Sequence, residues 1–218
     1  MKSIAQSELD RKRFVYSDIG FILLQQVVEA VTGKTLDVYL VSEFYRPMGL
    51  EHTLFQPLNR YKKADIMPTA ANDYLRRQDL CGYVHDEAAA FMGGVSGNAG
   101  LFSTAQELGK IYQMILNEGE LDGKRYLRPE TCRIFTTEKS AVSHRGLGYD
   151  KPNLKDPKAN ACASSAPASV YGHTGFTGTC AWVDPENDLV YIFLSNRLCP
   201  DAWNGKLNSM KIRQAVQE

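Results

Sequence analysis

The spacing of apolar residues changes once along the chain, and this change limits the folds that the sequence can adopt. Up to Phe135 the apolar residues recur mainly with helical spacing, whereas from Val170 onward they form short strand-like runs. Residues 180–183 and 189–194 flank an Asp-Pro-Glu-Asn turn and predict a β-hairpin, and residues 206–216 predict a C-terminal helix. Helices followed by an antiparallel hairpin and a closing helix predict an α+β fold, with a helical lobe beside a helix-covered sheet.

Two helices joined by a glycine turn are expected near the start of the chain. Ser17 or Asp18 can cap a helix over residues 18–31, and its apolar residues cover most of the circumference, so we expect it to be largely buried. A second helix is expected from Leu36 to about Tyr45. Further helices are expected over 85–91, 104–117 (with a Thr104 and Glu107 capping box) and 129–135, whereas 51–80 and 139–169 are expected to be irregular.

Composition excludes several classes of protein. The length of 218 residues predicts a single domain, and the 25 basic and 25 acidic residues cancel, which argues against a nucleic-acid partner. Five cysteines without Cys-x-x-Cys spacing argue against a disulfide framework and a cysteine zinc site. Met1–Arg13 has no apolar core typical of a signal peptide, and the run over 19–31 is too short to span a bilayer, so the localisation stays unknown.

Two segments have the residue types of a catalytic or binding site. Tyr16 and Asp18 stand at the mouth of the first helix, although an ordinary helix cap with a packed aromatic would look the same. Three glycines interrupt the expected strand over 171–179, which suits a strand that a ligand or another backbone approaches closely; a bulged strand is the alternative.

Two other segments argue against nucleotide, metal and cofactor sites. The loop over 93–100 holds four glycines but matches neither a P-loop nor a dinucleotide fingerprint, and Asn98 stands where a Gly-x-Ser-x-Gly elbow would end. His85, Asp86 and Glu87 are adjacent and would not face one metal ion. We therefore expect no metal and no cofactor.

The order of these motifs resembles that of the serine β-lactamase and D-alanyl-D-alanine peptidase superfamily, and most closely its class C-like esterase and peptidase branch. Tyr-Ser-Asp at 16–18 opens a helix, Gly-Gly-Val-Ser-Gly-Asn-Ala-Gly at 93–100 precedes a capped helix, and His-Thr-Gly at 173–175 lies on a late strand. The resemblance covers residues 10–216. It implies a helical lobe against an antiparallel sheet, with the site between them.

The resemblance also implies roles for residues of this chain. Tyr16 takes the place of the general base or proton relay, and Asp18 stands where the family has an asparagine. His173 would place a donor beside Tyr16, and the backbone N–H of Phe176 would form half of the oxyanion hole. The implied substrate-binding residues are Ser17, Thr174, Gly175 and Phe176.

The family's Ser-x-x-Lys motif is absent, because no serine of this sequence has a lysine three positions later. We therefore expect a single truncated domain over 1–218, the C-terminal part of such a hydrolase. About 14–168 would form a mostly helical lobe with loops, and about 169–218 the sheet strands and the closing helix. The parent would transfer lactam, ester or D-amino-acid amide acyl groups to water, and the chain alone would be inactive. The partners implied are a small-molecule or peptidoglycan-like substrate and, through exposed apolar surface, further copies of the chain.

Three functional hypotheses remain open from the sequence. The chain is a serine hydrolase fragment, a non-catalytic module that binds ligands in the leftover cleft, or an interaction protein whose sheet edge pairs with another chain. Members of the family are often exported to the periplasm or cell surface.

Overall fold

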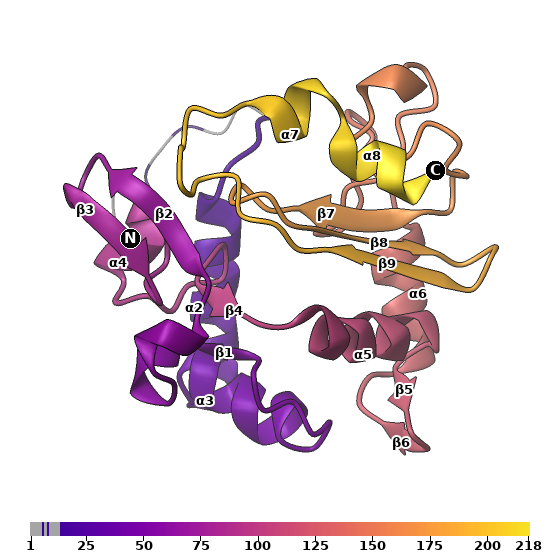
Figure 1. Cartoon of the computed structure of the whole chain (residues 1–218). Coiled ribbons are helices and arrows are strands. Elements are labelled where there is room, and N and C mark those ends of the chain that lie inside the picture. The colour runs from indigo at the N-terminus through magenta and orange to yellow at the C-terminus, as the bar shows by residue number, and fades with distance from the viewer. Residues whose placement is uncertain (1–5, 7, 9–13) are drawn as a thin grey trace.

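The structure, a computed structural model, describes residues 6, 8 and 14–218. The segment Met1–Arg13, on which the signal-peptide prediction rests, therefore lies almost wholly outside the described residues. Figure 1 shows two sides: α2 (Ile19–Thr32), α3 (Leu36–Leu40) and the short strands between residues 54 and 102 form one, and the sheet between residues 171 and 193 with its covering helices forms the other.

The three-stranded sheet has the order β7-β8-β9 and is antiparallel throughout. Its strands are β7 (Tyr171–Thr174), β8 (Cys180–Asp184) and β9 (Leu189–Phe193). His173 is paired with Ala181, and Trp182 with Tyr191, so β8 lies in the centre. All five residues of β8 are buried, as expected for the central strand of a sheet that is covered on both faces.

Helices cover both faces of this sheet (Figure 1). The helices α7 (Lys206–Ser209) and α8 (Ile212–Gln217) lie over one face, where the Tyr191 hydroxyl donates to the carbonyl of Arg213. The helices α5 (Ala105–Leu116) and α6 (Pro129–Thr137) lie on the other. Cys162, Val170, Cys180 and Trp182 form the buried cluster against the sheet.

The other side of the molecule is built from α2 (Ile19–Thr32) and α3 (Leu36–Leu40), which continues as a π-helical turn, η1 (Val41–Tyr45). A second buried cluster joins this side to α5. Its residues are Tyr45, Met48, Leu50, Met114 and Leu121. The short helix α4 (Glu87–Phe91) begins at Asp86, whose carboxylate accepts from the N–H of Ala89 at 2.8 Å.

The prediction that the first helix is buried is wrong. Gln25 is its one buried residue, whereas its apolar side chains at 19, 21, 23, 24, 27 and 31 are 38–81% exposed. Gln25 is buried because it bridges to the glycine loop: Gly97 N–H donates to Gln25 Oε1, and Gln25 Nε2 donates to Val95 O. A cavity of about 340 Å³ lies beside the helix, lined by Phe21, Leu24 and Tyr45 among others.

Two further predictions are corrected. Residues 51–80 are not an irregular connection: they hold β1 (Leu54–Phe55), two 3₁₀ turns (Pro57–Asn59 and Lys63–Asp65), β2 (Pro68–Asp73) and most of β3 (Gln78–Cys81). The β2–β3 hairpin contains register shifts, so its residues do not alternate cleanly between apolar and polar. The predicted helix over 206–216 is broken, because Lys211 adopts a left-handed conformation with φ of 50° between α7 and α8.

The predicted strand over 171–179 is too long, because β7 ends at Thr174 and the backbone turns over residues 175–179. The other predicted helices and the β8–β9 hairpin agree with the structure to within a few residues. The remaining short strands are β4 (Leu101–Phe102), β5 (Glu120–Leu121) and β6 (Lys124–Arg125), and a 3₁₀ turn covers Pro157–Ala159. Glu107 N–H donates to Thr104 Oγ1, as in a capping box, but the Glu107 carboxylate accepts from Glu51, His52 and Thr53 instead. No helix in the described part of the chain is long and apolar enough to cross a bilayer.

Candidate functional site

The residues predicted to form the site come together where the start of α2 faces the end of β7. The Tyr16 ring lies 6.2 Å from the His173 ring, centroid to centroid, with 29° between the ring planes. Tyr16 directly precedes the first turn of α2, and His173 lies on an edge strand of the sheet. The expected proximity of these two residues, which are far apart in the sequence, is therefore present in the structure.

Ser17 and Asp18 lie at the start of α2, and their hydrogen bonds serve the helix and not His173. Ser17 Oγ accepts from the N–H of Ile19 at 3.3 Å, and the Asp18 carbonyl accepts from Phe21 and Ile22. Among the described residues, no hydrogen bond joins either side chain to His173. Both are exposed, so their side chains are open to a ligand.

The His-Thr-Gly motif lies where β7 runs into a tight turn over residues 175–179. Thr174 is paired with Cys180, and Gly175 N–H donates to the carbonyl of Thr179 at 2.7 Å. A Cβ on Gly175 would lie 2.2 Å from Thr179 Oγ1, so a side chain at that position would force the Thr179 hydroxyl to move. Glycine at 175 therefore serves a close approach within the turn itself.

Residues 195–197 brace this turn through three successive carbonyl groups. Arg197 Nε donates to Phe176 O at 2.6 Å, Arg197 N–H to Thr177 O at 2.9 Å, and Ser195 Oγ to Gly178 O at 2.8 Å. No backbone acceptor in the described residues takes the N–H of Phe176. The carbonyl groups of the turn are thus tied to the fold, while this N–H remains available as a donor.

The side chain of Phe176 is 66% exposed and forms a small aromatic stack. The His85 ring lies 5.1 Å from it, and the guanidinium of Arg197 lies 4.3 Å from its ring centre. His85 therefore belongs to the wall of the site through stacking. In the described part of the chain, no cluster of three metal-ligating side chains occurs.

Sequence reasoning missed Arg145, which lies in the irregular stretch between α6 and β7. Its Nη1 lies 2.9 Å from His173 Nε2, and its Cζ lies 4.9 Å from the centre of the Tyr16 ring. Arg197 and Ser195 were missed as well. No local pattern surrounds Arg145 that would have singled it out, since only the folded chain brings it to the motif residues.

The region around Arg145 contains a second charged group. Asp150 is 7% exposed. Its carboxylate lies 2.9 Å from His144 Nε2 and 3.6 Å from Arg145 Nη2. Asp150 also forms an antiparallel bridge with Gly172, next to His173 on β7. The backbone of the sheet thus positions the carboxylate that partly neutralises Arg145.

Chemically, the arrangement offers a phenol, an imidazole, a guanidinium and a free backbone N–H within one exposed region. A tyrosine phenolate beside a cation can accept a proton and then donate it as the phenol, and an unpaired N–H can stabilise an oxyanion. Among the described residues, no serine side chain is hydrogen-bonded to the side chain of Tyr16, His173 or Arg145. Ser96, the serine of the glycine loop, is 3% exposed and donates to Asn98 Oδ1 at 2.6 Å.

Comparisons with known proteins give the family of this chain. The family model described as Beta-lactamase matches residues 1–212. A protein of Escherichia coli (strain K12) described as "Putative D-alanyl-D-alanine carboxypeptidase" is 38% identical over 197 residues, which make up 85% of this chain and 45% of that protein. The N-acetylmuramyl-L-alanine amidase of Bacillus subtilis (strain 168) is 36% identical over 197 residues, 85% of this chain and 44% of the relative.

Solved structures agree with this assignment at the level of the fold. A β-lactamase of Mycobacterium bovis matches with a TM-score of 0.60 and 20% identity, over 94% of this chain and 62% of that one. The expected α+β fold is confirmed by this likeness. The chain spans about 45% of the length of the two curated relatives. It belongs to the beta-lactamase family, as the order of its motifs suggested.

Proposed function

We propose that this chain supplies the tyrosine and histidine side of the acyl-transfer site of a D-alanyl-D-alanine carboxypeptidase-like serine hydrolase. Its family supports a β-lactamase-related hydrolase. The observation that carries the proposal is the meeting of Tyr16 and His173 at 6.2 Å, although 156 residues separate them in the chain. The substrates would be lactams, esters or D-amino-acid amides, and the names of the two relatives point to peptidoglycan-like material.

In the proposed reaction the phenolate of Tyr16 takes the proton of a serine hydroxyl while the serine oxygen attacks the substrate carbonyl. The carbonyl oxygen becomes an oxyanion, and the N–H of Phe176 donates to it. Collapse expels the leaving group, to which the proton returns, and leaves an acyl-serine ester that water then hydrolyses. Ser17, Asp18, Thr174 and Gly175 would line the substrate.

The attacking serine is not among the serines that these 218 residues offer. None is followed by lysine at the third position, and Ser96 is buried in its hydrogen bond with Asn98. The 218 residues alone should therefore not form an acyl-enzyme. A segment that bears Ser-x-x-Lys would have to lie against the exposed face of α2, next to Tyr16.

A fluorescent penicillin followed by intact-mass analysis tests this proposal. The chain is incubated alone and with a separate segment that carries the Ser-x-x-Lys motif of the family. We expect no adduct on the chain alone and an adduct on the added segment in the mixture. An adduct on the chain alone that Ser96→Ala abolishes would show that the nucleophile is misassigned.

The alternative is a non-catalytic module that binds ligands or self-associates on the same fold. The exposed apolar side chains of α2 favour it, because such a surface is normally covered. Size measurement in solution separates a ligand-binding monomer from an oligomer. A chain that is stable by itself, and whose melting temperature does not change when the segment is added, would favour the module over the hydrolase.

A further inference from the structure

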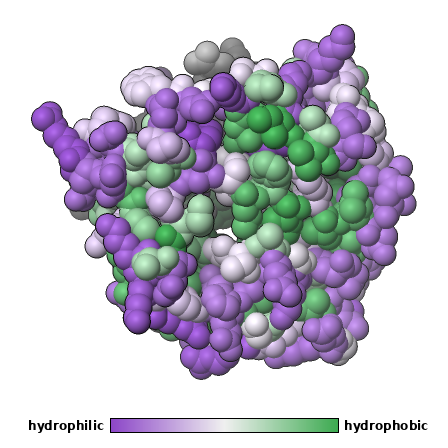
Figure 2. All heavy atoms as spheres, viewed as in Figure 1, coloured by the Kyte–Doolittle hydropathy of each residue, from purple (hydrophilic) through white to green (hydrophobic). Residues whose placement is uncertain are grey.

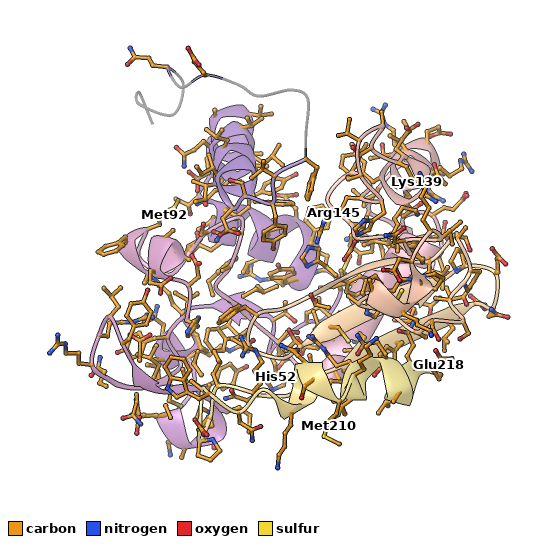
Figure 3. All side chains as sticks on the ribbon, turned by 90° about the horizontal axis from the view of Figure 1, so that it is seen from above. His52, Met92, Lys139, Arg145, Met210 and Glu218 are labelled. Atoms are coloured by element: carbon orange, nitrogen blue, oxygen red, sulfur yellow. The ribbon has the colours of Figure 1, made fainter. Side chains whose placement is uncertain are left out.

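Arg145 lies at the centre of the candidate site, between the side that carries α2 and the three-stranded sheet (Figure 3). Its guanidinium lies over the Tyr16 ring at 4.9 Å and near the Phe14 ring at 5.7 Å. Its side chain is 23% exposed, so the charge is partly shielded but reachable from solvent. Two aromatic rings and a histidine thus surround a single cation.

The two nitrogens of His173 have partners of opposite kinds. Nδ1 lies 2.7 Å from the carbonyl oxygen of Thr174, and Nε2 lies 2.9 Å from Arg145 Nη1. A carbonyl oxygen can only accept a hydrogen bond, and a guanidinium can only donate one. Both contacts are satisfied together only when Nδ1 carries the proton and Nε2 is unprotonated.

We propose that Arg145 is a positioning residue that holds His173 as the neutral imidazole protonated on Nδ1, and that Arg145 itself supplies the positive charge beside Tyr16. The lone pair of Nε2 is occupied by Arg145, so His173 offers neither a charge nor a free donor from that nitrogen. The role first assigned to His173, a donor beside Tyr16, passes to the guanidinium.

The remaining N–H groups of Arg145 have one charged neighbour, Asp150. Nη2 lies 3.6 Å from Asp150, beyond the length of a good hydrogen bond, and Asp150 is shared with His144. A guanidinium has five donors, so Arg145 keeps donors for an anion that enters beside Tyr16. This consequence for substrate rests on the proposed function, whereas the state of His173 does not.

Nitrogen-15 NMR of histidine side chains tests the proposal on the chain itself at pH 7. The protein has four histidines, and His173→Gln identifies the signals of His173. In the wild type we expect an Nε2 shift typical of an unprotonated imidazole nitrogen and an Nδ1 shift typical of a protonated one. Signals that show the proton on Nε2, or on both nitrogens, would overturn the proposal.

Two variants separate positioning from a merely structural role. Arg145→Met removes the donor to Nε2, so this nitrogen becomes free to take a proton and its signal should shift, while Nδ1 keeps its proton on the Thr174 carbonyl. Arg145→Lys keeps a cationic donor and should retain the wild-type signals. Arg133→Met, which removes an exposed guanidinium paired with Glu118, is the matched control. Unchanged signals of His52 and His85 show that each variant is folded.

The outcome is independent of catalysis. If Arg145→Met leaves the signals of His173 unchanged, the positioning role is wrong even if the acylation assay succeeds. If the acylation assay fails while the signals respond as expected, the proposed function is wrong and the role of Arg145 toward His173 stands.

Discussion

At the scale of single residues, the structure depends on a few places where backbones approach closely. A Cβ on Gly97 would lie 2.2 Å from the carbonyl oxygen of Phe21. The N–H of Gly97 also donates to Gln25 Oε1 at 3.0 Å, so the glycine loop and α2 are locked together here. The loop of four glycines therefore serves to receive a helix.

Gly97→Ala should therefore destabilise the fold by about 1–3 kcal/mol, because the loop or α2 must move to admit a methyl group. Gly109→Ala is the matched control: it lies inside α5 with no heavy atom within 4 Å of the added Cβ, and it should stabilise by roughly 1 kcal/mol. Urea unfolding of both variants checks the prediction. Equal effects would show that Gly97 is not in close contact with α2.

The burial of Gln25 could not be expected from the sequence, because Gln25 is a polar residue within a mainly apolar helix. Gln25→Ala removes two hydrogen bonds to the loop and leaves the Gly97 N–H without its acceptor, so we expect a loss of about 1–3 kcal/mol. Gln26→Ala alters an exposed neighbour and should change stability by less than about 0.5 kcal/mol. Similar values for the two would contradict the bridging role of Gln25.

Lys151 makes the stability depend on pH. Burial, with like-charge repulsion from Lys139 second, lowers the pKa of Lys151 from 10.5 to about 8. The side chain is 3% exposed, and its ammonium donates to the carbonyl of Thr136. Between these two pKa values the unfolded chain holds a proton that the folded chain has lost, so stability should rise with pH.

We expect the stability of the wild type relative to Lys151→Met to rise by about 2 kcal/mol between pH 7 and pH 9.5. Urea unfolding at each pH measures the difference, and Lys155→Met is the exposed control. A difference that stays flat or falls with pH would mean that Lys151 is not desolvated as described.

At the scale of elements, the C-terminal helix shows how local pattern and tertiary structure diverge. Lys211 has φ of 50°, which is unfavourable for a residue with a Cβ and acceptable for glycine. Lys211→Gly should therefore be neutral or stabilise by up to about 1 kcal/mol. Ala215→Gly, in the interior of α8, should cost about 1 kcal/mol.

Thermal unfolding of these two variants decides between one helix and two. If Lys211→Gly costs as much as Ala215→Gly, residues 206–216 form one continuous helix and the break described here does not exist.

The elements that could be predicted from sequence are those with strong local signals. The hairpin of β8 and β9 has a turn of Asp, Pro, Glu and Asn between apolar runs, and α5 begins at a Thr104 cap, so both appear as expected. The hairpin of β2 and β3 was missed because its register shifts and its polar residues hide the period of two. The burial of α2 was misjudged because an apolar circumference says nothing about which neighbours are present.

The residues of the candidate site also fall into those that could be predicted from the sequence and those that could not. Tyr16 and the His-Thr-Gly segment could be found because they match motifs in a fixed order along the chain. Arg145 and the brace of Ser195 and Arg197 could not, because their roles arise from contacts across the sheet and the irregular stretch before β7. Such contacts depend on tertiary structure and leave no periodic trace in the sequence.

At the scale of the whole molecule, the main feature is the amount of apolar surface that is exposed to solvent. Figure 2 shows hydrophobic residues gathered over the three-stranded sheet, and the apolar side chains of α2 are exposed as well. The net charge of zero does little to oppose association. These features support the proposal that copies of the chain associate.

Sedimentation velocity over a range of concentrations measures this association. We expect the wild type to sediment as a dimer or larger species, and the double variant Leu24→Lys with Val27→Lys, which charges the α2 face, to shift toward monomer. Val38→Lys places a charge at a similarly exposed site on α3 and serves as the control. A wild type that remains monomeric at all concentrations would contradict association through this face.

The central claim is that Tyr16 acts in acyl transfer, and the rate of acylation by a fluorescent penicillin tests it most directly. The measurement uses the chain together with the Ser-x-x-Lys-bearing segment and compares Tyr16→Phe with Tyr83→Phe, since both tyrosines are 58% exposed. We predict that Tyr16→Phe lowers the rate about 100-fold or more, because the proton acceptor is lost, while Tyr83→Phe leaves it unchanged. Acylation that proceeds at the same rate in both variants would contradict the assignment of Tyr16 and, with it, the proposed site.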